Sequence, residues 1–458
     1  MIFWNTLKRS ENWSRFFLYT LFIGSTFSIA ATEASIIMLY LIGLGQLIWR
    51  RQLPDLRDGL LQVSLVYIVV AILASWLAGY GVDWLMALRT HWRLLLPFVL
   101  AGVLAEANEE RVLQVFAVFL LIIAVYGIVQ FFNGAEWLRL NDGNKVAHYY
   151  QQEEIARYHA EGNFSHHLTF GGVLLPCFAL FTALTLCQEW SSGVRILATG
   201  LALLLLGALV ATLGRSIWLG TGMVLFVLGL WRLPKTTLLV GLLTAGLLAL
   251  LITKSISGTG VELVGKQAAG VSTTEAQGFW EATLRSSAAA QGAILRRAES
   301  MFSLGENRDR LLMWKSGVAA LKDHPWWGIG YDMDGTVMPA YRKPFEQTGH
   351  NFMNGPSAGV HNIYLQTWLN YGFFGLLAYL GIWVVFFLKS LRASRRASRF
   401  GYENAVLWGV MAGAAGLMVA GVFENNFRDG EVQTCLLMLM GLSLRQMHKS
   451  KKRIFRMT

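Results

Sequence analysis

Residues 112–132 read VLQVFAVFLLIIAVYGIVQFF, an apolar stretch without a single charged side chain. About 20 such residues in a helix cross the hydrocarbon core of a bilayer, which is ~30 Å thick. A helix satisfies its own backbone hydrogen bonds in lipid, so we expect a transmembrane helix here. Twelve apolar segments of this kind occur along the chain. They lie at about residues 16–33, 35–49, 59–80, 92–106, 112–132, 167–187, 194–213, 216–231, 236–253, 362–388, 404–424 and 431–446.

The composition agrees with a membrane protein. Hydrophobic residues make up 54% of the 458 residues and charged residues only 15%, too few to cover a soluble protein of this length. The formal net charge is +11, but the basic residues gather in short connections between apolar segments. This distribution follows the positive-inside rule and does not form the basic stripes of a nucleic-acid binder. We therefore expect a lipid bilayer as partner and no nucleic acid.

The charge distribution also predicts a topology. Counting twelve crossings from a cytoplasmic N-terminus places every strongly basic short connection, such as residues 389–399, on the cytoplasmic side. The prediction is an all-α integral membrane protein, one polytopic domain over residues 1–458, with both termini in the cytoplasm. Two long connections then lie outside: a first loop at about 133–166 and a large, mainly helical loop at about 254–361. A connection as long as the second is usually functional.

The three cysteines do not predict a redox or metal site. Cys177, Cys187 and Cys435 lie in or at the ends of apolar segments, and none belongs to a CxxC pair. We expect small packing residues rather than a disulfide framework or a zinc site.

Arg215 is the first candidate for chemistry on the outer side. It stands in TLGRSIW, residues 212–218, at the tight junction of two apolar segments. Charge at a membrane boundary is costly unless it is paired or useful. A guanidinium at this level is well placed to bind a phosphate near the head groups. The alternative is an arginine that snorkels or caps the turn.

Arg310 is the second candidate. It lies with Arg308 in NRDRLLMWK, residues 307–315, whose apolar residues predict the start of an amphipathic helix. Ordinary solvated charges are the simpler interpretation. A role in anion binding requires Arg310 to lie near Arg215, which the sequence does not indicate.

His361 is the third candidate. It begins HNIYLQTW, residues 361–368, where the large loop meets the next apolar segment. A lone loop histidine is more often structural, but imidazole at the rim of an outer cavity suits a general base near neutral pH. Asn362 is placed to cap the helix that follows.

Two further motifs favour no metal. RYHAEGNFSHH, residues 157–167, contains three histidines whose spacing fits no zinc pattern, while Arg157 offers a further anion contact. Asp332 and Asp334 form a DxD motif, which in sugar-nucleotide transferases holds a cation on a diphosphate. Sugar nucleotides are cytosolic and this loop is predicted outside, so we interpret both aspartates as part of a solvated loop.

Several function classes are disfavoured. The sequence has no Walker A motif, no strand–GxGxxG–helix fingerprint, no HExxH and no GxSxG, so nucleotide hydrolysis and serine or zinc proteolysis are not expected. A flippase or transporter of lipid-linked sugars would carry charges inside several helices. Here the apolar segments are nearly free of charge and the candidates crowd the outer side, which favours an enzyme.

Short motifs occur in a fixed order over about residues 160–380. They are Gly162 with His166, GRS at 214–216, Arg310 with Trp314, HPWWGIG at 324–330, and His361-Asn362 followed by Leu365, Gly372 and Gly375. In this order, and on the outer side, they resemble the O-antigen ligase/polymerase superfamily. The similarity is closest to the lipopolysaccharide O-antigen ligases.

The resemblance implies a GT-C-like membrane glycosyltransferase of the bacterial inner membrane, inverting, independent of metal and without a cofactor. Its donor would be a polysaccharide on undecaprenyl diphosphate and its acceptor a sugar hydroxyl of lipid A–core, joined on the periplasmic side. By motif position, Arg215 and Arg310 would bind the donor diphosphate and His361 would be the catalytic base. Further substrate contacts would come from Arg157, His166, Arg308 and Asn362.

Related activities stay open at this point. An O-antigen polymerase or a protein O-oligosaccharyltransferase would share the two arginines and the histidine, and only the acceptor would differ. A lipid-linked sugar flippase remains the alternative outside this class.

Overall fold

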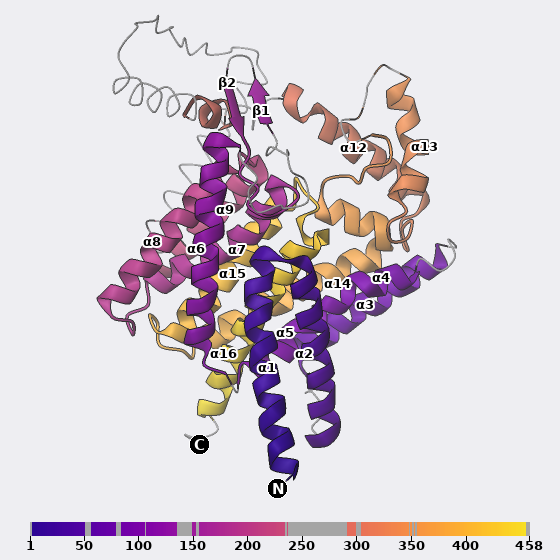
Figure 1. The fold of residues 1–458 in the computed structure, drawn as a ribbon. Helices are drawn as coiled ribbons and strands as arrows, with labels where there is room; N and C mark the ends of the chain where they lie inside the picture. The colour runs from indigo at the N-terminus through magenta and orange to yellow at the C-terminus, as the bar shows by residue number, and fades with distance from the viewer. Residues whose placement is uncertain are drawn as a thin grey trace, which may run out of the picture.

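A computed structural model describes most of the chain. It covers residues 2–50, 56–78, 84–105, 107–134, 149–152, 155–233, 236, 291–298, 304–347, 349, 352 and 355–454. The elements, labelled in Figure 1, are α1 (Ile2–Phe27), α2 (Ile29–Arg50), α3 (Gly59–Leu77), α4 (Trp84–His91), η2 (Trp92–Leu95), α5 (Leu96–Val103), α6 (Glu109–Asn133), β1 (Tyr149–Gln152), β2 (Ile155–Tyr158), α7 (His167–Thr185), α8 (Ser192–Ala211), α9 (Arg215–Arg232), α12 (Leu304–Asp323), α13 (Asp334–Glu346), α14 (Ile363–Ser394), α15 (Tyr402–Ala420), η4 (Asn426–Arg428) and α16 (Gly430–Ile454).

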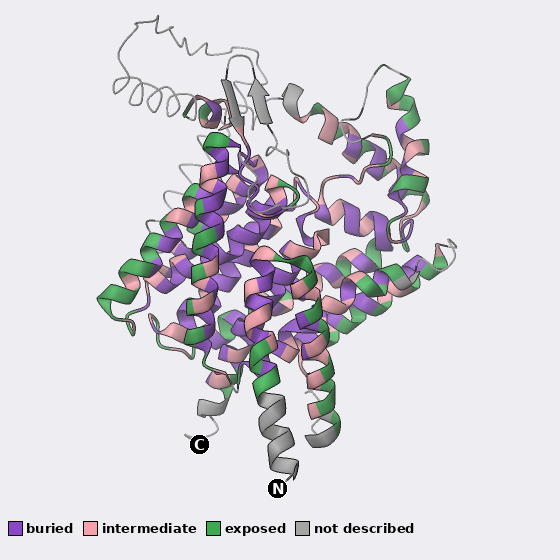
Figure 2. Cartoon of the chain, viewed as in Figure 1, coloured by how far each residue is buried: buried purple, intermediate pink, exposed green. Residues whose placement is uncertain are grey.

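The expected all-α membrane fold is confirmed. Within the described residues, seven helices are long and apolar enough to cross a membrane: α2, α3, α6, α7, α8, α14 and α15. Figure 2 shows buried residues through the centre of the bundle and exposed ones on the outward faces of α2, α6 and α8. Large apolar side chains occupy these outward faces, among them Leu41, Val118 and Leu197. An apolar exterior of this kind fits a lipid environment.

Most predicted segments overlap one helix each, but segment 16–33 runs across the break between Phe27 and Ile29 that separates α1 from α2. The ninth, 236–253, lies outside the described residues apart from residue 236, so the count of twelve stays a prediction. Segment 92–106 is not one helix: η2 leads into the short α5, because Pro97 lacks an amide hydrogen and favours a first helical turn. Eight residues rise only about 12 Å, too little to cross a bilayer.

The first loop contains the only strands of the described chain. β1 and β2 form an antiparallel hairpin in which Tyr149 pairs with Tyr158 and Tyr150 with Arg157. The start of α1 and the end of α16 lie at one end of the molecule, while this hairpin, α12 and α13 lie at the opposite end (Figure 1). The described ends of the chain therefore lie opposite the two loops, while the location of both termini in the cytoplasm stays a prediction. Which side faces the cytoplasm remains a prediction.

Helices α7 and α15 form the centre of the bundle. The apolar windows of these helices are 83% and 72% buried, the highest fractions among the seven. Small residues permit close backbone contact here: a Cβ added to Gly220 of α9 would lie 2.7 Å from the carbonyl oxygen of Gly416 on α15. Close packing of small residues is the usual way in which helices associate in lipid.

The predicted helix over 362–388 is interrupted. Gly372 adopts φ of 68° and ψ of −171°, so α14 consists of two helical parts that meet at this residue. The HPWWGIG motif fills the break. Ile329 donates its N–H to the Leu369 carbonyl at 2.7 Å, and the N–H of Phe373 reaches the Pro325 carbonyl at 3.0 Å. These bonds satisfy backbone groups that the interrupted helix leaves without helical partners.

Candidate functional site

His361 sits in a constrained turn just before α14. Its φ of 49° is in the left-handed region, which costs a non-glycine residue roughly 1–3 kcal/mol. Directly after it, the Asn362 side-chain oxygen accepts the N–H of Tyr364 at 3.0 Å and of Leu365 at 2.9 Å. The predicted helix cap at Asn362 is therefore confirmed. The cap places His361 directly before the first turn of α14, outside the apolar part of the helix.

A buried carboxylate joins two of the predicted site residues. Glu424 follows α15, and its side chain is only 8% exposed. One of its oxygens accepts a hydrogen bond from Arg310 Nη2 at 2.5 Å, and the other lies 3.4 Å from His361 Nδ1. Arg310 comes from α12, so three separate segments meet at this carboxylate. A buried charge needs such partners.

The sequence analysis missed Glu424. The residue is the last of the apolar segment 404–424, and an acid at the outer end of such a segment was the available signal. Its partners are 63 and 114 residues away in sequence, so no local pattern links them.

Arg215 occupies a different turn, between α8 and α9. It is the first residue of α9, with Gly214 as the N-cap. The preceding Leu213 has φ of 53°, and its carbonyl accepts a hydrogen bond from Arg297 Nε at 3.0 Å. His159, next to β2, bonds the Thr212 carbonyl through Nδ1 at 2.7 Å. Both loops thus fix this turn, and Arg215 stands at a helix N-terminus, where anions bind favourably.

The remaining predicted contacts lie in three places. His166 caps α7 through Nδ1, which accepts the Leu168 N–H at 3.2 Å, and its ring lies 4.2 Å from that of His167. Arg157 lies in β2, and Arg308 is exposed on α12. Contact of these residues with substrate stays a prediction.

The prediction that both DxD aspartates are solvated is wrong for one of them. Asp332 is 71% exposed, but Asp334 begins α13 and is only 6% exposed. Arg428 explains the difference, because its guanidinium pairs with both carboxylates, with Nη1 2.9 Å from Asp334 Oδ2. Burial alone would lower the pKa of Arg428, but the Asp334 carboxylate outweighs it and raises the pKa above the usual arginine value. Within the described residues, no group of three or more His, Cys, Asp or Glu side chains is arranged to hold a metal ion.

The chain was compared with known proteins. Residues 200–380 match a protein-family model described as O-Antigen ligase. The match supports the resemblance to the O-antigen ligase/polymerase superfamily over this part of the chain. Arg215, Arg310 and His361 all lie inside the matched residues, whereas Glu424 and Arg428 lie beyond them. No curated protein matches the chain.

Proposed function

We propose that the protein is an O-antigen ligase. It transfers a polysaccharide from undecaprenyl diphosphate to a sugar hydroxyl of lipid A–core at the periplasmic face of the bacterial inner membrane. One observation carries the proposal: Glu424 holds a histidine and an arginine together, next to the first residues of the apolar helix α14. The family match over residues 200–380 supports the substrate class.

The histidine supplies the base. With Nδ1–H directed to Glu424, the other ring nitrogen of His361 presents a lone pair to the acceptor hydroxyl. His361 takes the hydroxyl proton as the oxygen attacks the anomeric carbon of the donor. The bond from that carbon to the diphosphate oxygen breaks, and its electron pair leaves with undecaprenyl diphosphate. A single displacement of this kind inverts the anomeric centre, and Glu424 stabilises the imidazolium that forms.

The arginines stabilise the leaving group. A guanidinium has five N–H donors in a planar fork, and the bond to Glu424 uses one N–H of Arg310. Bidentate binding to a diphosphate suits the rest of the fork. Arg215 adds its charge at the N-terminus of α9. Because the donor carries its own activated leaving group, the reaction needs no nucleotide, and preorganised positive charge lowers the barrier directly.

Complementation tests this function. A bacterial strain that makes O-antigen but lacks its ligase receives the wild-type chain or His361→Ala. We expect the wild-type chain to restore capped lipid A–core on a gel and His361→Ala to fail at the same membrane level. His448→Ala, an exposed histidine on α16, is the matched control and should cap normally.

Deletion of this protein from the host that encodes it separates the related activities. A ligase defect leaves long polysaccharide on the lipid carrier, so the carrier-linked glycan should be long when this protein is absent. Single repeat units on the carrier would instead identify a polymerase. Glycosylated protein without capped lipid A–core would identify a protein O-oligosaccharyltransferase, and either result would overturn the ligase proposal.

A further inference from the structure

We propose that Gln366 is a positioning residue that fixes His361 against Glu424, with Asp334 and Arg428 holding Gln366 in place. The inference rests on the proposed function of His361 as the base. Gln366 lies on α14 and is 1% exposed, and its side chain bonds the residues next to His361 and Glu424. It acts on the residues beside them.

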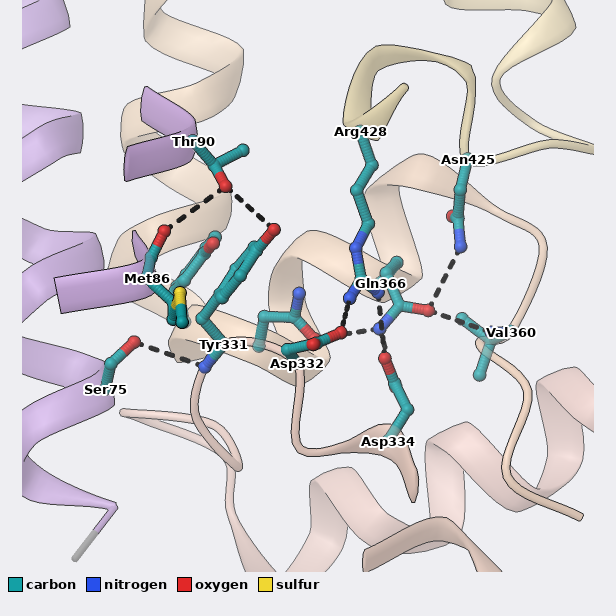
Figure 3. A network of polar contacts seen from close by, with 12 residues as sticks. Ser75, Met86, Thr90, Tyr331, Asp332, Asp334, Val360, Gln366, Asn425 and Arg428 are labelled. Carbon is teal, nitrogen blue, oxygen red and sulfur yellow. Dashed lines mark hydrogen bonds and ion pairs between the residues drawn. The ribbon is translucent and has the colours of Figure 1, made fainter. Parts of the chain in front are cut away.

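The amide oxygen of Gln366 ties together the two segments that carry the pair. Oε1 accepts the backbone N–H of Val360 at 2.8 Å and the side-chain amide of Asn425 at 3.2 Å (Figure 3). Val360 directly precedes His361, and Asn425 directly follows Glu424. One buried oxygen therefore sets the distance between two segments that are otherwise far apart in sequence.

The amide nitrogen of Gln366 determines how that oxygen points. Nε2 donates to Asp334 Oδ1 at 2.7 Å and to Asn370 Oδ1 at 2.8 Å. The ion pair between Asp334 and Arg428, drawn beside it in Figure 3, holds the aspartate carboxylate in place as an acceptor. With a carboxylate on the nitrogen side and a backbone N–H on the oxygen side, the amide has only one satisfactory orientation.

Backbone geometry explains why these hydrogen bonds of Gln366, which we call the clamp, are needed. The left-handed conformation of His361 persists only if the surrounding structure imposes it. Asn362 anchors the residue after it to α14, and the bond from Val360 to Gln366 anchors the residue before it. Gly359 completes the clamp, since a Cβ there would lie 2.6 Å from Gln366 Oε1. The DxD motif, to which we assign no metal, thereby has a function: its Asp334 holds Gln366, which in turn positions the base His361.

An exchange of donor and acceptor tests the clamp. Gln366→Glu keeps Oε1 but sets a second carboxylate against Asp334, and it should lower kcat by roughly 100-fold, the cost of misplacing a reacting group by about 1 Å. KM for the lipid-linked donor should stay the same, because Gln366 does not bind it. Adding Asp334→Asn restores one donor and one acceptor in reversed order and should return kcat to within roughly threefold of wild type.

Controls separate this inference from general damage. Gln62→Glu makes the same chemical change at an exposed position on α3 and should leave both constants unchanged. Gln366→Asn, neutral but one methylene shorter, should also lower kcat at unchanged KM and serves if Gln366→Glu does not reach the membrane.

The outcomes are distinct. Wild-type kcat in Gln366→Glu or Gln366→Asn, with His361→Ala inactive, would overturn this inference alone. A failure of Asp334→Asn to rescue Gln366→Glu would also overturn it. Full activity in His361→Ala would instead overturn the proposed function.

Discussion

Glu424 lies 3.4 Å from His361 Nδ1, although 63 residues separate them in sequence. Because the second Glu424 oxygen binds Arg310, the carboxylate connects the proposed base with one of the arginines proposed to bind the diphosphate. A change of charge at His361 therefore alters the electrostatic environment of Arg310 through Glu424, and the reverse also holds.

Glu424→Gln should keep the shape of the site and remove its charge. A hydrogen bond to a charged group is worth about 1.5–3 kcal/mol, so kcat should fall roughly 10- to 100-fold. Steady-state transfer rates measure this effect. Glu403→Gln, at the opposite end of α15, is the control, and an equal loss in that variant would contradict the account.

Gly372→Ala should disrupt the junction in α14. A Cβ at this residue would lie 1.9 Å from the Trp326 carbonyl oxygen, in a left-handed conformation. Backbone strain and overpacking each cost about 1–3 kcal/mol, so we expect a loss of roughly 2–6 kcal/mol. Thermal unfolding in detergent reports it. Gly381→Ala, later in the same helix, meets its nearest atom at 3.5 Å and should unfold like wild type.

Arg428→Met should lower the free energy of unfolding, because the buried Asp334 carboxylate loses its ion-pair partner. Removal of one member of a buried ion pair costs about 3–5 kcal/mol, because the other charge stays buried. Adding Asp334→Asn removes that charge and should recover most of the stability. Asp332→Asn alone should cost less than about 1 kcal/mol, since Asp332 is 71% exposed. Equal losses in Asp332→Asn and Arg428→Met would argue against this interpretation.

Arg215→Lys should separate charge from geometry. Lysine keeps the charge but not the planar fork that binds a diphosphate at two points. We expect kcat/KM for the donor to fall at least roughly tenfold, which corresponds to the loss of one or two hydrogen bonds to a charged group. Arg232→Lys, at the other end of α9, should not change it. A wild-type value in Arg215→Lys would show that only the charge matters.

A chelator should leave transfer unchanged. The two DxD carboxylates are already paired with Arg428, so the proposed mechanism assigns them no cation. Activity of the purified protein with and without EDTA measures this directly. A loss that Mg²⁺ or Mn²⁺ restores would contradict the metal-independent mechanism.

The sequence predicts the helices well because hydropathy alone decides which segments enter lipid. It does not predict the break at Gly372, since one glycine in an apolar run resembles helix. Only the bonds to residues 325–330, which arrive from another loop, hold the break open. The Arg428 ion pair with Asp334 likewise spans 94 residues, so Asp334 resembles any loop acid until the fold is known.

The candidate site divides in the same way. His361 and Arg215 could be selected because polar side chains are rare at the ends of apolar segments, and Arg310 because it stands in a short motif of the large loop. Gln366 could not, because its importance comes from what it touches. Glu424 offers only its charge at the end of a segment, with no local pattern that links it to its partners. A glutamine within an apolar helix gives no sign that its oxygen accepts two bonds from separate segments.

The most direct test is transfer by the purified full-length protein in lipid nanodiscs. Undecaprenyl-diphosphate-linked polysaccharide is the donor and lipid A–core the acceptor. The account predicts capped lipid A–core with the wild-type chain and His448→Ala, and a rate lower by about 10²–10⁴-fold with His361→Ala. Capping by His361→Ala at the wild-type rate would contradict it.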